Sequence, residues 1–243
     1  NTENDILQLP EKIAIEKGIQ IVICIDELQQ ISDFEDSKTF QKKLRSVWQL
    51  QQHVSYCLFG SKKHLMNELF EKKNLPFYKF GDAIYLAKIE TKYWIEYICK
   101  RFENTGKHIS PELAEEICRL VDNHSSYVQQ LSWLLWIRTI NTATTEQLSY
   151  ALEDLLDQNN ILFQSETENL SAYQMNFLKA IVDGIHTKFS SKEVISKYNL
   201  GTSANIVRLK NALLQKELIE TNGKEIVLAD PVFGVWFKKE MLY

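Results

Sequence analysis

The first third of the chain alternates between amphipathic stretches and short apolar runs. Apolar residues recur at helical spacing over 6–17 and 37–52, which predicts two helices packed through one face. Three short runs, at 19–25, 54–59 and 83–86, are almost wholly apolar and predict strands. The first is expected to be buried on both faces, and the second is also expected to be buried. Strands that alternate with helices in this way predict right-handed crossovers and a parallel sheet.

From Thr91 the pattern changes to nearly continuous helix. Ser110-Pro111 is typical of a helix start, with a serine cap followed by proline in the first turn. From about Ser171 the pattern predicts three helices and then two short strands around Asn222-Gly223, a strong hairpin signal. Three helices followed by a hairpin is the winged-helix layout. The fold expected is an α/β sheet remnant, an all-α segment and a winged helix, mainly helical in total.

A chain of 243 residues is long enough for two or three small domains. We place them at 1–90, 91–165 and 166–243. The formal net charge of −4 argues against a general nucleic-acid coat, although a local basic patch is compatible with it. No apolar run approaches the roughly 20 residues that span a bilayer, and the first residues lack signal-peptide character. We therefore expect a cytoplasmic protein with no membrane contact.

The four cysteines each lie in an apolar context and form no CxxC pair. This pattern predicts buried free thiols in a reducing compartment and gives no metal-ligand spacing. They are Cys24, Cys57, Cys99 and Cys118.

Two adjacent carboxylates, Asp26 and Glu27, directly follow the first apolar run. In open α/β sheets, ligands bind just outside the carboxyl ends of the strands. The pair is therefore interpreted as the acidic half of an NTPase site, with Asp26 holding Mg²⁺ and Glu27 polarising the attacking water. The alternative is a solvated turn after a core strand.

Several further motifs occur in a fixed order after this doublet, and together they resemble an archaeal-type P-loop ATPase of the STAND/AAA+ neighbourhood in the ASCE division. The resemblance runs from Ile21 to the C-terminus, and each motif alone is weak. The motifs lie at 26–29, 59–66, 76–81, 123–131 and 229–233.

The resemblance implies a role for each motif. Asp26 would be the Walker B metal ligand, Glu27 the general base, and Ser61 the sensor that contacts the γ-phosphate or the lytic water. Ser61 could equally be a helix N-cap. His124 and Tyr127 would open the lid helix that contacts the nucleotide. The resemblance also implies ATP and Mg²⁺ as cofactors of the intact parent, and a winged helix that reports the nucleotide state.

The chain departs from this family in one large respect, because nothing in it fits the phosphate loop GxxxxGK[ST]. The stretch Gly60-Ser61-Lys62-Lys63-His64 is rich in lysine but lacks the glycine spacing. We expect the loop to lie upstream of Asn1 in the parent, and this fragment alone to bind no cofactor and to lack ATPase activity. Loss of a central strand would leave unpaired edges that favour self-association.

The winged-helix segment carries a modest positive charge, with five cations against one carboxylate between 190 and 216. Asn205, Arg208 and Lys210 on its third helix could touch phosphates and base edges. Arg208 and Lys210 lie about 160° apart on a helix, so they form no single stripe. The alternatives to an ATPase switch are a DNA-binding, initiator-like regulator with ATP as conformational effector, or a scaffold with a decayed site that binds an unknown protein.

Overall fold

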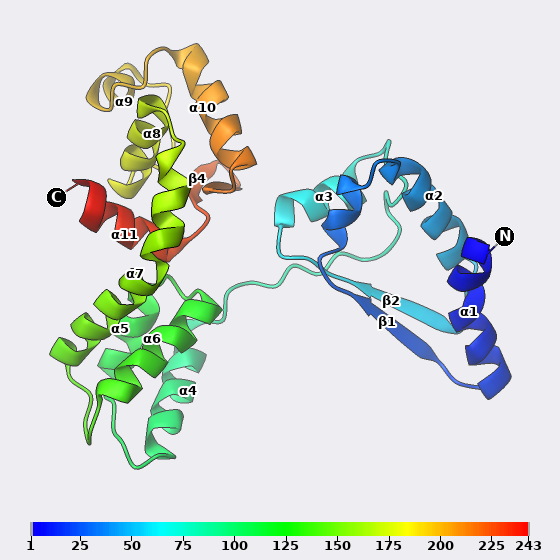
Figure 1. The fold of residues 1–243 in the computed structure, drawn as a ribbon, viewed down its shortest axis with the longest axis horizontal. Helices are drawn as coiled ribbons and strands as arrows, with labels where there is room; N and C mark the ends of the chain where they lie inside the picture. The colour runs from blue at the N-terminus through cyan, green and yellow to red at the C-terminus, as the bar shows by residue number, and fades with distance from the viewer. Residues whose placement is uncertain (1, 243) are drawn as a thin grey trace. The chain divides into compact units, whose positions relative to one another are not determined.

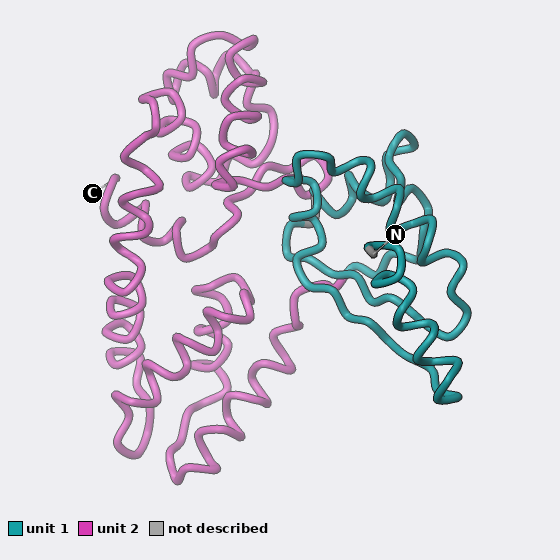
Figure 2. The backbone as a smooth tube through the Cα atoms, turned by 45° about the vertical axis from the view of Figure 1, so that its right-hand side comes forward, with its two compact units in different colours: residues 1–85 teal, residues 86–243 magenta. Residues whose placement is uncertain are grey.

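The computed structural model describes residues 2–242, which form two compact units, residues 1–85 and residues 86–243 (Figures 1 and 2). The elements of the first unit are α1 (Thr2–Lys17), β1 (Ile21–Ile25), a 3-10 helix (Leu28–Asp33), α2 (Ser37–Trp48), β2 (Val54–Leu58) and α3 (Lys63–Glu71). The elements of the second unit are α4 (Thr91–Glu103), α5 (Pro111–Leu120), α6 (Ser125–Arg138), α7 (Thr145–Glu168), α8 (Ala172–Val182), α9 (Lys192–Lys197), α10 (Ser203–Gln215), β3 (Ile219–Asn222), β4 (Glu225–Leu228) and α11 (Pro231–Leu242).

The two strands of the first unit pair in parallel, as predicted, from Ile21 opposite Val54 to Ile25 opposite Leu58. One face of this sheet packs on a core of helix and loop side chains that centres on the buried Trp48. The Trp48 ring stacks on Tyr56 with 4.2 Å between ring centroids. Burial of these large apolar surfaces gives the unit its own hydrophobic core.

The prediction that β1 is buried on both faces is wrong, and β2 is likewise covered on one face only. Exposure alternates along β1 and β2, and Val22 has 66% of its surface exposed. Cys24 and Cys57 are also exposed, contrary to the prediction of buried thiols, whereas Cys118 is fully buried. The reason is that the described residues of the first unit cover only one face of the sheet.

The predicted third strand at 83–86 is also absent. Ile84 is 85% exposed and Leu86 is 93% exposed, and neither pairs with a strand among the described residues. An apolar run becomes a strand only where a neighbouring backbone accepts its hydrogen bonds. The sheet of this unit therefore has two strands, each with one unpaired edge in the part of the chain that the structure describes.

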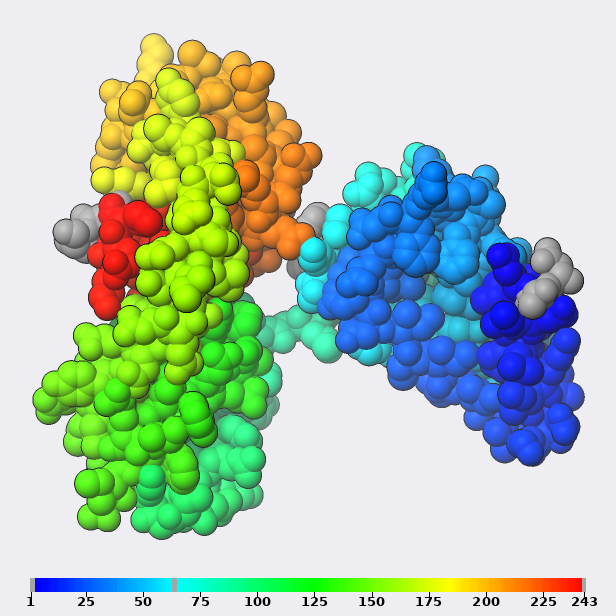
Figure 3. Space-filling model, viewed as in Figure 1, coloured from blue at the N-terminus to red at the C-terminus, as the bar shows by residue number. Residues whose placement is uncertain are grey.

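The second unit has one continuous core that runs from α4 to α11. Its longest helix, α7, begins in the helical bundle and reaches the winged-helix part (Figures 1 and 3). Trp236 in α11 donates a hydrogen bond of 2.8 Å to Asn160 in α7. Helices α8, α9 and α10 and the β3–β4 hairpin follow in the predicted winged-helix order.

Local capping follows the sequence closely in this unit. Ser110 accepts a hydrogen bond from the Leu113 amide, which confirms the predicted start of α5. Thr144 and Ser171 form capping boxes at the starts of α7 and α8. Among the described residues, no helix is long and apolar enough to cross a membrane.

Candidate functional site

Backbone hydrogen bonds on either side of Asp26 and Glu27 continue the pairing of β1 and β2 beyond the strand ends. The Phe59 amide donates to the Ile25 carbonyl at 3.0 Å, and the Leu28 amide donates to the Phe59 carbonyl at 3.1 Å. These two bonds hold the segments after β1 and β2 side by side. The structure therefore brings together the acidic doublet and the loop that contains Ser61.

Glu27 contacts Ser61 across this edge of the sheet. Ser61 donates to the Glu27 carboxylate through its hydroxyl at 3.1 Å and through its amide at 3.4 Å. Glu27 has a left-handed backbone conformation with φ of 51°, which is uncommon for a residue with a side chain. Such conformations persist where the surrounding structure holds them, and they occur often at functional sites.

The Glu27 carboxylate is held in its ionised form. Hydrogen bonds from Gln29 and then from Ser61 lower the pKa of Glu27 below its ordinary value. An ionised carboxylate accepts hydrogen bonds only, so this group can orient a hydroxyl or a water molecule. Ser61 is one such donor in the structure.

Gln29 belongs to the 26–29 motif, but the sequence did not indicate a role for its side chain. Its side chain is only 2% exposed and donates to Glu27. Its side-chain oxygen lies 1.9 Å from the point where a Cβ on residue 60 would be, so a side chain at position 60 would force the Gln29 amide to move. The same oxygen is buried without a hydrogen-bond partner among the described residues. The only sequence signal was its position two residues after Glu27.

Asp26 lies beside this cluster and is exposed. One of its carboxylate oxygens accepts the Glu27 amide at 2.8 Å. Carboxylate oxygen suits Mg²⁺, which usually keeps several waters and takes further ligands from substrate phosphates. In the described part of the chain, no group of three His, Cys, Asp or Glu side chains is placed to hold a metal ion. The Lys63 and His64 side chains lie outside what the structure describes.

His124 and Tyr127 lie together in the second unit, with ring centroids 4.8 Å apart. The Tyr127 hydroxyl donates to the Asp230 carboxylate at 2.5 Å, and burial followed by this bond raises the pKa of Tyr127. His124 has a buried Nδ1 with no partner among the described residues. The Tyr127 hydroxyl therefore joins α6 to α11, and a nucleotide contact by either residue stays a prediction.

The three residues predicted to contact nucleic acid have different surroundings on α10. Asn205 donates to the Leu200 carbonyl at 3.0 Å, so its amide nitrogen holds the turn before the helix. Arg208 is exposed and Lys210 is half-buried. Because these two residues lie on nearly opposite sides of the helix, the structure does not bring all three to one surface.

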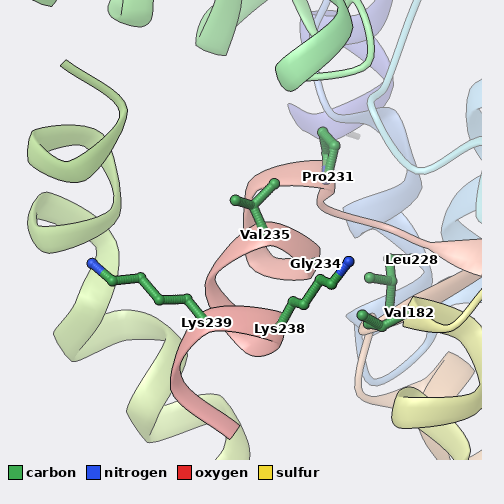
Figure 4. A pocket seen from close by; sticks show the side chains of 7 residues that line it. All are labelled: Val182, Leu228, Pro231, Gly234, Val235, Lys238 and Lys239. Atoms are coloured by element: carbon green, nitrogen blue, oxygen red, sulfur yellow. The ribbon is translucent and has the colours of Figure 1, made fainter. Parts of the chain in front are cut away.

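A separate groove of about 530 Å³ lies in the second unit beside α11 (Figure 4). Val182, Leu228 and Val235 contribute aliphatic walls, and Lys238 and Lys239 extend from α11 in different directions. Pro231 of the 229–233 motif lines this groove, but none of the residues predicted to contact nucleotide, metal or nucleic acid does. It is therefore distinct from the cluster at Glu27.

Comparisons with known proteins agree with the fold described above. A family model described as a probable winged helix domain matches residues 161–239. A Walker-type ATPase of Pyrococcus abyssi has a similar structure, with a TM-score of 0.75 at 16% identity; the match covers 97% of this chain and 67% of that chain. Among curated proteins, no sequence matches this chain.

Two DNA-related proteins are more distantly similar in structure. The RuvB Holliday junction branch migration motor of Thermotoga maritima has a TM-score of 0.46 at 14% identity, over 95% of this chain and 73% of that chain. The Orc1 protein of Aeropyrum pernix, solved in complex with DNA, has a TM-score of 0.44 at 10% identity. The match covers 90% of this chain and 64% of that chain.

The similarity to the Pyrococcus protein shows that the fold resembles that of a P-loop ATPase, as predicted from the ordered motifs. The C-terminal winged helix is likewise confirmed by the family model and by the order of α8, α9, α10 and the hairpin.

Proposed function

We propose that this chain carries the acidic and sensor side of an ATP-binding and ATP-hydrolysing molecular switch. The observation that carries the proposal is the contact between Glu27 and Ser61 at the carboxyl ends of two parallel strands. Ligands of open α/β sheets bind at this edge. The similarity in fold to a Walker-type ATPase also supports the proposal of an ATP-hydrolysing switch.

In this proposal each side chain has one task. Asp26 would ligate Mg²⁺, which neutralises charge on the phosphates when it is bound. Glu27 would accept a proton from the attacking water, and Ser61 would orient Glu27 and sense the γ-phosphate. The phosphate loop itself has no match in the sequence. We place its contribution along the unpaired edge of β2, beside Gly60 and Ser61.

The proposed switch has three parts with separate tasks. Residues 1–90 would hold the nucleotide, residues 91–165 would form a lid, and residues 166–243 would form the winged helix that follows the lid. The Tyr127–Asp230 bond supports joint movement of the last two parts, because it ties a bundle helix to α11. Closure of a lid over bound nucleotide is a common way to convert hydrolysis into a conformational signal.

The test uses the full-length gene product, with ATP binding and phosphate release measured separately. Glu27→Gln is expected to retain ATP binding and to lose hydrolysis by about 10²-fold or more, because the general base is gone. Asp26→Asn is expected to weaken Mg²⁺-dependent binding. Glu35→Gln, which changes another exposed carboxylate of the first unit, is the matched control. Unchanged hydrolysis in Glu27→Gln would contradict the assignment.

The chain on its own provides a second measurement. Because GxxxxGK[ST] is absent from it, we expect no ATP affinity in the micromolar range and no phosphate release. Titration calorimetry with Mg²⁺-ATP would measure this directly. Micromolar affinity would show that the phosphates are bound without such a loop.

A DNA-binding regulator is the second candidate, and the exposure of Arg208 on α10 favours it. In winged-helix proteins the third helix is placed to enter the major groove. Val207 is 62% exposed on the same helix, and the hairpin strands carry Glu220 and Glu225, so the surface is mixed and only weakly basic. This mixed character is the reason that DNA binding ranks second.

A gel shift with duplex DNA at several salt concentrations separates the two candidates. If the winged helix binds DNA, Arg208→Ala should weaken binding and reduce its salt dependence, because one phosphate contact is lost. Arg101→Ala, at an exposed arginine on α4, is the matched control. If Arg208→Ala and Arg101→Ala bind DNA equally well, Arg208 on α10 makes no contact with the DNA.

A further inference from the structure

Cys24 and Cys57 are partners in the parallel register of β1 and β2. Both are free and exposed. Their flanking residues follow the same alternation, since Val22 and Ser55 are exposed while Ile23 and Tyr56 are half-buried. The two thiols therefore lie next to each other on the uncovered face of the sheet.

The spacing of adjacent strands suits a bond between these sulfurs. Neighbouring strands lie about 4.7–4.9 Å apart, and Cα atoms joined by a disulfide lie about 4.4–6.8 Å apart. Side chains in parallel register stand nearly parallel, so their Cβ atoms are separated by about the strand spacing, slightly above the roughly 3.5–4.5 Å found in disulfides. A small local twist closes that difference, and two-stranded ribbons twist readily.

We propose that Cys24 and Cys57 form a reversible dithiol–disulfide site that reacts with small disulfides such as oxidised glutathione. The thiolate of one cysteine attacks the reagent, which gives a mixed disulfide and releases one glutathione thiolate. The second cysteine attacks the protein sulfur of the mixed disulfide and releases the second glutathione. The protein loses two electrons and two protons, and one oxidised glutathione becomes two reduced molecules.

The other two cysteines are poor competitors for this reaction. Burial raises the pKa of Cys99, and burial raises the pKa of Cys118 to about 11. Cys118 is also fully buried among apolar side chains. Since the thiolate is the reactive form, both groups serve as internal controls in the same molecule.

The position of the pair suggests what oxidation would do. Cys24 lies two residues before Asp26, and Cys57 lies three residues before Gly60. A covalent bond there would fix the register of the two strands whose ends hold Glu27 and Ser61. The thiol chemistry itself is independent of the proposed nucleotide site, and an exposed disulfide of this kind is expected to be easily reduced.

The experiment incubates the full chain with oxidised glutathione under native conditions, then alkylates it in denaturant and maps the peptides by mass spectrometry. The expected result is loss of two of the four alkylatable thiols and a Cys24–Cys57 linked peptide that dithiothreitol releases. Cys24→Ser and Cys57→Ser should each retain a stable glutathione adduct on the remaining partner. Near-ultraviolet circular dichroism before oxidation verifies that each variant is folded.

Three outcomes would overturn the proposal. They are two glutathione adducts on one molecule, a disulfide formed only between molecules on a non-reducing gel, and no reaction at either cysteine while the chain is folded.

Discussion

Tyr127 and Asp230 are joined by a hydrogen bond of 2.5 Å, although they are 103 positions apart in the sequence. Asp230 also accepts the Val232 amide at 2.7 Å and the Phe233 amide at 3.1 Å, so it caps α11 while it binds Tyr127. One carboxylate thus fixes both the start of the last helix and its contact with α6. Together with the bond from Trp236 to Asn160, the Tyr127–Asp230 bond links the helical bundle to the winged-helix part.

Loss of this bond should destabilise the second unit. Tyr127→Phe removes the hydroxyl from a largely buried position and is expected to lower the free energy of unfolding by about 1–3 kcal/mol, as for other bonds to charged acceptors. Urea unfolding followed by circular dichroism measures the change. Tyr173→Phe, at an exposed tyrosine on α8, should leave stability nearly unchanged. Equal stability of both variants would mean that water replaces the bond without cost.

Glu166 gives the second unit a pH dependence of known sign. Burial, and then the nearby charge of Asp230, raises the pKa of Glu166 in the folded protein. A carboxyl group with a raised folded-state pKa stabilises the fold when protonated, and its contribution falls as pH rises from about 4.3, the unfolded value, through the folded pKa. Glu166→Gln should therefore raise the Tm at pH 7 and have little effect near pH 4. The exposed Glu168→Gln is the control, and a uniform shift at both pH values would refute the expectation.

A side chain at Gly60 should be accommodated only by movement of Gln29. In Gly60→Ala the new Cβ would collide with Gln29, which is itself held under Glu27, and we expect a loss of about 1–3 kcal/mol as in other overpacked cores. Gly81→Ala is the matched control, because no atom lies within 4 Å of its Cβ position. The cost of Gly60→Ala should shrink in a Gln29→Ala background, as a double-mutant cycle would measure. If the effects of Gly60→Ala and Gln29→Ala on the free energy of unfolding are additive, the cost of Gly60→Ala does not come from contact with Gln29.

Arg45 should anchor the loop after α3. It donates hydrogen bonds to the carbonyls of Pro76 and Tyr78, the latter at 2.9 Å, and its guanidinium lies 5.7 Å from the centre of the Phe80 ring. Both hydrogen bonds come from Nη1 of the guanidinium. Lysine lacks this planar group, which also lies against Phe80, so Arg45→Lys is expected to cost about 1–3 kcal/mol in urea unfolding. Lys42→Arg, at an exposed position on the same helix, should cost almost nothing. A tryptophan signal from Trp48 would report the unfolding of this unit.

The sequence predicted the candidate site in part. It placed Asp26, Glu27 and Ser61 at the ends of neighbouring strands, and the structure brings Glu27 and Ser61 into contact. It included Gln29 in the first motif but did not indicate its burial, because a glutamine two residues beyond the doublet resembles any surface polar residue. The Gln29 amide packs against Gly60, and only the fold brings these two residues together.

The periodicity of apolar residues determined the order of helices and strands, the parallel pairing of β1 and β2, and the winged-helix layout, because these depend on short-range spacing and on connection rules. The helix cap at Ser110 was also predictable, because its hydrogen bond joins residues only three positions apart. Tertiary structure alone decided that Ile84 and Leu86 remain unpaired, that Cys24 and Cys57 share an uncovered face, and that Tyr127 reaches Asp230. Those outcomes depend on which parts of the chain, distant in sequence, pack against each other. An apolar pattern predicts that a residue can be buried, but it does not predict which residues cover it.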